Sequence, residues 1–282
     1  SAGGNHGPEA LVAFLGELAA QATPPAHVVL LGSASFDARD YTGAHAVDFV
    51  PAATYKESGT GMFAWSDAQY ALDGAGVPAF SIGRIAARDR DDAFVYLEKL
   101  FVYEADLAAN GPSGHSLAVV DSASNHDIDF AAAASQFVDT LGPASSAGTL
   151  LVSAAGARAT LGAALAQSPD VVGYFGHGNA LWWSERQILT RDDPPTLTGT
   201  RATFVLSTAC LDGMHPFVYG PPLIWALIAD TTQPRAGAIG AIAATTTMRA
   251  DLAAGFENFV VDAIVSGQAR TWGQAVLLAR RH

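Results

Sequence analysis

The fold is decided by the stretch Val171-Val172-Gly173-Tyr174-Phe175-Gly176-His177-Gly178 and by a second one, Phe204-Val205-Leu206-Ser207-Thr208-Ala209-Cys210. Each is an apolar run that predicts a buried strand, and each delivers one reactive side chain, His177 or Cys210, at its C-terminal end. Open α/β sheets gather their chemistry at that end of their strands. A cysteine that lies near a histidine in space is a candidate nucleophile with its base. The two stretches therefore predict a Cys–His site at one edge of a sheet.

The rest of the chain alternates apolar runs with amphipathic segments, which is typical of an α/β protein with a mostly parallel sheet flanked by helices. The breaker cluster at 110–114 predicts a boundary between a smaller N-terminal α/β subdomain, 1–110, and a larger C-terminal subdomain, 111–282, that carries the site. Strands are expected at 27–31, 78–83, 117–120, 150–152, 171–175, 204–207 and 238–242. Helices are expected at 8–22, 88–107, 130–141, 158–167, 222–228, 250–265 and 272–280.

Composition excludes several classes of function. The formal net charge of −12 argues against nucleic acid or an anionic membrane surface as the main partner, because both require a basic footprint. Neither of the lysines, Lys56 and Lys99, lies in a phosphate-binding P-loop. A single cysteine excludes an intrachain disulfide and a cysteine-based metal cluster. No run of about 20 apolar residues predicts a membrane span.

Two blocks of sequence surround the candidate residues: the His block, Gly176-His177-Gly178 with Trp183-Ser184, and the Cys block, Ala209-Cys210-Leu211-Asp212-Gly213. Further motifs lie upstream: His27-Val28-Val29-Leu30-Leu31-Gly32 followed by Ser33-Ala34-Ser35-Phe36-Asp37, Trp65-Ser66-Asp67 with Tyr70, Ser81-Ile82-Gly83-Arg84-Ile85, and Glu98-Lys99 through Tyr103-Glu104. With these motifs in this order, the chain resembles, over nearly its whole length, the gingipain-type cysteine peptidases, which share the caspase–haemoglobinase fold. Ser33 departs from the family, which more often has Asp at this position.

The resemblance implies a caspase-like fold and a cysteine endopeptidase, and the chemistry of peptide hydrolysis gives the same residues their roles. Cys210 would be the nucleophile. His177 would protonate the leaving amine and then help to activate water. The backbone N–H groups of Gly178 and Cys210 would form the oxyanion hole, since glycine lets the backbone approach the carbonyl closely. Taken singly, a buried cysteine is most often a small core residue, but the two blocks together favour catalysis.

Two aspartates are candidates for the remaining polar roles. Asp121 follows the predicted strand 117–120 and could hold His177 in its tautomer, as triad logic requires. A strand-end aspartate also commonly caps the next turn or helix. Asp127 resembles the family's acid in the pocket for the residue before the scissile bond, where a carboxylate would pair with a substrate Arg or, second, Lys. It could equally be a solvated loop acid or a helix cap.

Two weaker patterns remain. Trp182 and Trp183 could form a wall of the substrate cleft and stack on the alkyl part of a basic side chain, or they could belong to the core. The proposed chemistry requires no cofactor, and no spacing indicates a catalytic metal. A structural calcium, as secreted members of the family often have, could take oxygen ligands from Asp67, Asp73, Asp91 and Asp92, although their spacing is not that of an EF-hand loop.

Two other functions fit the same features. A catalytically silent caspase-like domain would bind or scaffold within a larger secreted protein, although such a domain has no chemical reason to keep both Cys210 and His177. A sorting transpeptidase of this fold would use the same dyad. The expected partners are protein or peptide substrates and other parts of a larger precursor, since the chain starts at Ser1 and not at Met. The resemblance implies a secreted or cell-surface location.

Overall fold

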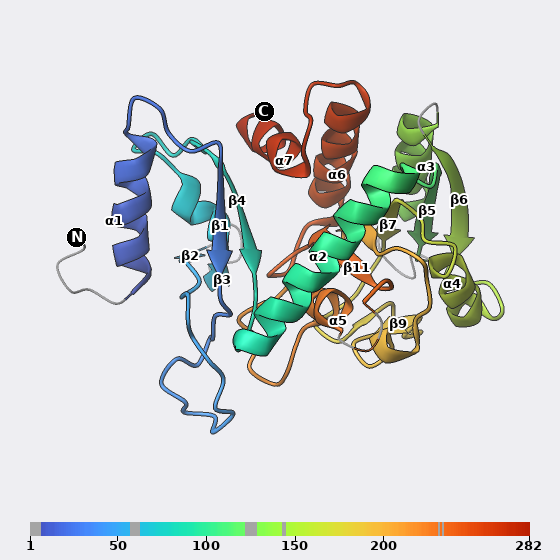
Figure 1. The fold of residues 1–282 in the computed structure, drawn as a ribbon, viewed down its shortest axis with the longest axis horizontal. Coiled ribbons are helices and arrows are strands. Elements are labelled where there is room, and N and C mark those ends of the chain that lie inside the picture. Colours follow the sequence, from blue (N-terminus) through green and yellow to red (C-terminus); the bar gives the residue numbers. More distant parts are fainter. Residues whose placement is uncertain (1–6, 57–62, 122–128, 143–144, 231, 233) are drawn as a thin grey trace.

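The computed structural model describes residues 7–56, 63–121, 129–142, 145–230, 232 and 234–282, and Figure 1 shows how their helices and strands are arranged. A five-stranded sheet with its helices forms the larger part of the molecule, and a smaller lobe, built on a two-stranded sheet, lies beside it. Among the described helices, none is both long and apolar enough to cross a membrane.

All strands of the large sheet run parallel, in the order β11-β10-β7-β5-β6. The chain enters at β5, adds β6 on one side, and then crosses over to add β7, β10 and β11 on the other side. This reversal makes a switch point between β5 and β7, where open α/β sheets form a crevice at the carboxyl ends of their strands. The strands are β5 (His115–Val120), β6 (Ser146–Leu151), β7 (Val171–Phe175), β10 (Thr203–Ser207) and β11 (Ala238–Ile242).

Helices cover both faces of this sheet because its central strands are apolar on both sides. Every residue of β7 is buried. Val172 packs in one cluster with Leu161 of α4 and Ile224 of α5, while Phe175 packs in another with Phe137 of α3. Helices of the first face are α2 (Arg90–Asn110), α4 (Ala157–Leu165) and α5 (Leu223–Ala229), and those of the second are α3 (Phe130–Leu141) and α6 (Ala250–Val265), on which α7 (Trp272–Arg281) packs.

The N-terminal part of the chain forms the smaller α/β lobe with a core of its own. Strands β1 (His27–Leu31) and β4 (Ser81–Ile85) pair in parallel, and β2 (Thr54–Lys56) pairs antiparallel with β3 (Phe63–Trp65). Helix α1 (Pro8–Ala19) packs on the short 3₁₀ helix η1 (Asp67–Ala71). The core of this lobe consists of Leu15, Leu30, Ala53, Tyr70, Ala71 and Phe80.

Two helices join the lobe to the large sheet. Helix α2 follows β4 in the chain but packs on α5 and β11, and the buried ammonium of Lys99 donates to the carbonyls of Leu227 and Ile228 at 3.0 and 3.2 Å. Helix α7 packs on β4, where Arg281 donates to the carbonyl of Pro78 at 2.8 Å. The helix that the sequence assigned to the N-terminal subdomain thus contributes to the core of the large sheet (Figure 1).

The predicted architecture, a mostly parallel sheet flanked by helices with a smaller N-terminal α/β unit, is confirmed. The predicted strands 171–175 and 238–242 agree with β7 and β11 at both ends. Strand β6 begins before its predicted start at 150, because its first residues lie on the exposed edge of the sheet and carry no apolar pattern. The short elements β8 (Trp182–Trp183), β9 (Leu189–Thr190) and η2 (Pro194–Thr196) were not predicted, since two or three residues show no periodicity.

Arg84 on β4 is the polar centre of the N-terminal lobe. Its guanidinium donates to both carboxylate oxygens of Asp67, each at 2.7 Å. It also donates to the carbonyls of Gly32, Val50 and Pro51, at 2.7, 2.7 and 3.3 Å. The Arg84 side chain is only 5% exposed, so this buried charge depends on the complete set of acceptors.

We expect Arg84→Met to lower the free energy of unfolding by about 3–5 kcal/mol, because it leaves the nearly buried carboxylate of Asp67 without its counter-charge. Arg84→Lys should recover only part of the loss, since an ammonium cannot reproduce the planar fork. The matched control is Arg88→Ala, which breaks an ion pair with Asp92 from a 44% exposed side chain and should cost about 0.5 kcal/mol or less. Urea denaturation measures all three variants, and equal losses at Arg84 and Arg88 would contradict the prediction.

Candidate active site

Strands β7 and β10 lie side by side in a register that brings their C-terminal ends level. Tyr174 pairs with Ser207, so that partners differ by 33 in residue number (207 − 174). His177 and Cys210 differ by the same 33 positions. The N–H of Thr208 donates to the carbonyl of Tyr174 at 3.0 Å, which continues the pairing past the strand ends. The two predicted catalytic residues therefore leave the same edge of the sheet at the same level, from neighbouring strands.

Cys210 is half-buried in the turn that follows β10. The backbone N–H of Met248, in the segment after β11, donates to its Sγ at 3.4 Å. The next residue, Leu211, has a φ of 66°, a left-handed conformation that is strained for a residue with a branched side chain. Its N–H donates to the carbonyl of Thr246 at 3.1 Å. The segment after β11 thus holds the cysteine in a strained turn.

Donors on both sides fix the backbone of His177. Its carbonyl accepts a hydrogen bond from Oη of Tyr174 at 2.6 Å and another from the N–H of Ser184 at 2.8 Å. Burial raises the pKa of Tyr174 well above its usual range, so this hydroxyl keeps its proton and remains a donor. The imidazole meets the ring of Phe130 edge on, with the ring centroids 5.2 Å apart. The start of α3 thus packs against the imidazole while β7 and Ser184 fix its backbone.

Gly178 lies against the Cys block. A Cβ at this position would lie 2.9 Å from Cβ of Ala209, the residue before Cys210. Gly178 also bridges Trp183 in an antiparallel pair whose hydrogen bonds are made by the neighbouring residues. In such a pair the N–H of Gly178 points away from Trp183. This placement is compatible with the oxyanion-hole role predicted for Gly178 and Cys210.

Asp121 directly follows β5, the strand on the other side of β7, and is 8% exposed. Its N–H donates to the carbonyl of Phe175 at 2.9 Å, and its Oδ1 accepts from the hydroxyl of Ser184 at 3.1 Å. A side chain on Gly176 would collide with Cβ of Asp121, so the residue before His177 has to be glycine. Asp121 is therefore connected to His177 through Ser184, whose N–H holds the histidine carbonyl.

The residues predicted to contact substrate fall in different environments. Trp182 is half-buried and is the first residue of β8, the strand that follows the turn after His177. Trp183 is 1% exposed and stacks on Tyr174 with the ring centroids 4.3 Å apart. Its burial corrects the expectation that it lines the cleft, because it has no surface to offer a substrate. Asp127 lies outside the described residues.

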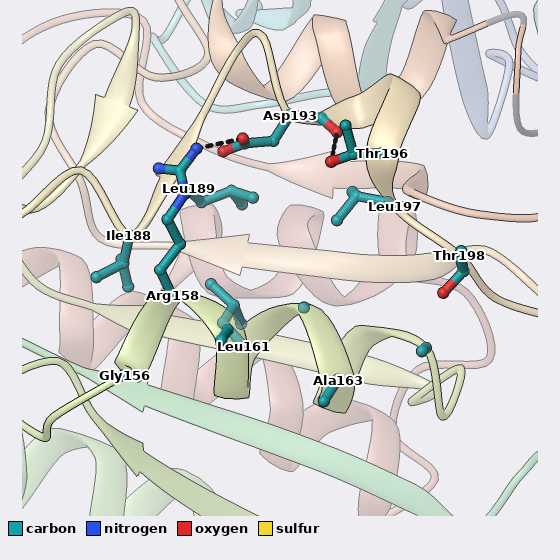
Figure 2. Close-up of a pocket in the computed structure, with 13 residues that line it drawn as sticks. Gly156, Arg158, Leu161, Ala163, Ile188, Leu189, Asp193, Thr196, Leu197 and Thr198 are labelled. Atoms are coloured by element: carbon teal, nitrogen blue, oxygen red, sulfur yellow. Dashed lines mark hydrogen bonds and ion pairs between the residues drawn. The ribbon is translucent and has the colours of Figure 1, made fainter.

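A cavity of about 420 Å³ is lined by the segment after β11, including Met248, whose N–H donates to Sγ of Cys210, but Cys210 itself does not line it. A larger cavity of about 620 Å³ lies between α4 and the segment 188–198, and Figure 2 shows Arg158 reaching across it to Asp193. None of the predicted site residues that the structure describes lines this larger cavity. The smaller cavity is likewise lined by none of the predicted site residues that the structure describes, so neither cavity marks the site predicted from the sequence.

The four aspartates considered as calcium ligands have different partners or positions in the structure. Asp67 and Asp92 form ion pairs with arginines, Asp73 accepts hydrogen bonds from the backbone of its own turn, and Asp91 lies in the first turn of α2. Across the described part of the chain, no group of three or more His, Cys, Asp or Glu side chains is placed to hold a metal ion. The structural calcium stays a prediction.

Comparison with known proteins places the chain among peptidases. The model of the family described as Peptidase family C25 matches residues 1–282. The crystal structure of the Arg-specific cysteine proteinase gingipain R (RgpB) is similar with a TM-score of 0.79 at 17% identity, over 96% of this chain and 62% of that chain. The complex of the Porphyromonas gingivalis RgpB pro- and mature domains gives 0.78 at 16% identity, over 96% and 63%.

A third structure, described only as a protease, has a TM-score of 0.64 at 14% identity, over 90% of this chain and 52% of that chain. No curated protein sequence gives a significant match. At these identities the solved structures show a shared fold. The chain spans 62% of the length of the RgpB chain that it matches.

We expect Gly176→Ala to lower the free energy of unfolding by about 1–3 kcal/mol, because the new Cβ would press on Asp121 and lie 2.6 Å from Oη of Tyr174. The matched control is Gly162→Ala on α4, where no atom lies within 4 Å of the new Cβ. That change should raise stability by up to about 1 kcal/mol, since alanine is the better helix former. Urea denaturation measures both variants. A Gly176→Ala protein as stable as the wild type would show that β5 and β7 do not end in this close contact.

Proposed function

The chain belongs to peptidase family C25, and from this membership we propose that it is a cysteine endopeptidase in which Cys210 and His177 form the catalytic dyad. The family and the gingipain fold support a cysteine peptidase. The observation that supports the assignment of the dyad is the register of β7 and β10, because His177 and Cys210 each lie three positions beyond the last paired residues, Tyr174 and Ser207. The site lies next to the switch point of the sheet, where this class of fold binds its ligands.

Peptide hydrolysis at this site proceeds through an acyl-enzyme. The Cys210 thiolate bonds to the carbonyl carbon of the scissile peptide, and the N–H groups of Gly178 and Cys210 bind the resulting oxyanion. His177 gives its proton to the amine as the C–N bond breaks, which leaves a thioester. The neutral imidazole then takes a proton from water, and the water oxygen bonds to the thioester carbon. The C–S bond breaks, which regenerates the Cys210 thiolate and releases the product with a free carboxylate. Asp121 holds the turn of His177 through Ser184.

We propose cleavage after Arg, with Lys as the second choice. The similar structure of RgpB is described as Arg specific, and Asp127 resembles the acid that binds the basic side chain in this family. A carboxylate accepts two parallel hydrogen bonds from a guanidinium, whereas it meets an ammonium as a point charge. Trp182, half-buried beside the turn of His177, would stack on the alkyl part of that side chain.

The expected partners are protein or peptide substrates and the remainder of a larger precursor, and the proposed location is outside the cell or on its surface. The resemblance to secreted peptidases supports the location. The solved complex of RgpB pro- and mature domains supports a precursor, because that protein is described with a separate pro-domain.

We expect the purified protein to cleave fluorogenic peptides after Arg and more slowly after Lys, and Cys210→Ala to abolish this cleavage. His177→Ala should lower kcat by about 10²–10⁴, the usual contribution of a general acid–base. The measurement compares peptides that differ only at the residue before the scissile bond, in reductant, with and without calcium. The control is His45→Ala, since this side chain is 86% exposed and belongs to the smaller lobe.

Because the chain has one cysteine, alkylation by iodoacetamide reports on Cys210 alone. Cleavage after other residues would keep the dyad and reject the pocket assigned to Asp127. Products joined to an added amine, in place of free carboxylates, would identify a transpeptidase with the same dyad. Absence of both turnover and alkylation would contradict the proposal and favour a catalytically silent binding domain.

A further inference from the structure

Asp212 lies two residues after Cys210 and is completely buried. Its Oδ2 accepts a hydrogen bond from the indole N–H of Trp183 at 2.8 Å and a second from the hydroxyl of Ser207 at 2.5 Å. Trp183 belongs to β8, which follows His177, and Ser207 is the last residue of β10, which leads to Cys210. One carboxylate oxygen thus connects both halves of the candidate site.

The bond to Trp183 acts on the turn of His177. The indole stacks on Tyr174 with the two planes 4° apart, and the backbone of Trp183 bridges Gly178 across the turn. The hydroxyl of Tyr174 in turn holds the carbonyl of His177. A shift of the indole would therefore move the ring that anchors His177 and the backbone of the glycine that follows it.

The bond to Ser207 acts on the turn of Cys210. The hydroxyl oxygen of Ser207 also accepts from the N–H of Ala209 at 3.3 Å. Beyond the cysteine, the carbonyl of Asp212 accepts from the N–H of Ile224, in the first turn of α5, at 3.1 Å. Cys210 thus lies between two points, Ala209 and Asp212, that are both fixed by this network.

We propose that Asp212 is a positioning residue of the dyad, whose carboxyl holds the turn of His177 and the turn of Cys210 at a fixed separation without touching the substrate. The inference rests on the proposed peptidase function. Burying a carboxyl group costs free energy, and an apolar side chain would fill the same space without that cost. The carboxyl group therefore contributes geometry, because its hydrogen bonds to donors from two different segments fix how those segments lie relative to each other.

A second buried acid makes this link sensitive to pH. Glu257 on α6 is 2% exposed, and Oδ1 of Asp212 and Oε2 of Glu257 each have no hydrogen-bond partner among the described residues. Burial raises the pKa of Asp212 to about 7. Burial and then the charge of Asp212 raise the pKa of Glu257 well above its usual range. The other titratable groups near this network are Tyr174, kept protonated by burial, and Asp121, directly after β5, whose charge acts on Tyr174.

The direction of the pH effect follows from these raised values. A carboxyl whose pKa is higher in the folded state stabilises the fold while it is protonated in both states. That contribution is lost as pH rises from about 4, where an unfolded aspartate ionises, through about 7. The denaturation midpoint of Asp212→Asn, measured relative to that of the wild type, should therefore rise between pH 5 and pH 8. Glu257→Gln should show a relative rise of the same sign.

The test of the positioning role is kinetic. Asp212→Ala should lower kcat about 10²-fold, the usual effect of a misplacement of about 1 Å, and leave KM nearly unchanged because the side chain is buried. Asp212→Asn keeps an oxygen that can accept from Trp183 and should recover most of the loss. Trp183→Phe keeps the stacked ring without the N–H and should also lower kcat. The matched control is Asp262→Asn, the same chemical change at an exposed site on α6, which should alter nothing.

A second readout separates this inference from the peptidase function. The rate of Cys210 alkylation by iodoacetamide at pH 6.5 depends on the neighbouring imidazole, whereas at pH 9 a thiol ionises without help. We expect Asp212→Ala and Trp183→Phe to slow alkylation at least tenfold at pH 6.5 and little at pH 9. If the wild type cleaves no peptide but its alkylation depends on Asp212 in this way, the peptidase function fails and the positioning role stands. Unchanged kcat and alkylation in folded Asp212→Ala, or in Trp183→Phe where the alanine variant does not fold, would overturn the inference.

Discussion

The site depends on the register between two buried parallel strands. A slip of one residue between β7 and β10 would move Cys210 about 3.3 Å along the strand relative to His177 and turn its side chain to the opposite face. Such a slip is costly because every residue of β7 is buried, as are four of the five residues of β10. The side chains of the slipped strand would move from the core on one face of the sheet to the core on the other face. The packing of helices on both faces thus sets the distance between the two reactive groups.

Beyond the C-terminal ends of the strands, a network of polar side chains, and no longer apolar packing, holds the chain in place. Tyr174 and Ser207 are still strand residues, yet their hydroxyl groups hold the first loop residues beyond them. Asp212 and Ser184 then connect the loops to one another. A buried polar group in such a network destabilises the fold when it lacks a hydrogen-bond partner. When every group is hydrogen-bonded, the network fixes the relative positions of its members. The apolar packing of the sheet supplies the stability that offsets the cost of burying these polar groups. The hydrogen bonds of the network then fix the positions of the loops, which apolar contacts alone would not do.

The sequence was most informative where a strand is a short, almost wholly apolar run. Strands β1, β7 and β11 were predicted at both ends for this reason, although only β7 is buried at every residue. It was least informative where position depends on distant partners. Trp183 was interpreted as a cleft residue, since nothing in its neighbourhood shows that Asp212, 29 positions later, receives its N–H. His177 and Cys210 were paired because each follows a predicted buried strand at its C-terminal end, and the register between those strands appears only in the structure. Asp212 stood in the same motif, but its burial and its link to Glu257 arise only when α6 packs on the sheet.

The edge that carries the site is packed backbone against backbone. A Cβ on Gly176 would lie 2.6 Å from Oη of Tyr174, one on Gly178 2.9 Å from Cβ of Ala209, and one on Gly213 2.9 Å from Cβ of Ala243. Three glycines close in sequence to the proposed dyad therefore lie at points where neighbouring segments leave no room for a side chain. Close approach of backbones brings their N–H groups near the reacting centre, which is what stabilising an oxyanion requires. The close packing also leaves the side chains of His177 and Cys210 little freedom to move apart. The glycines allow the two turns to come close together, and the proposed role of Asp212 is to hold them at that separation.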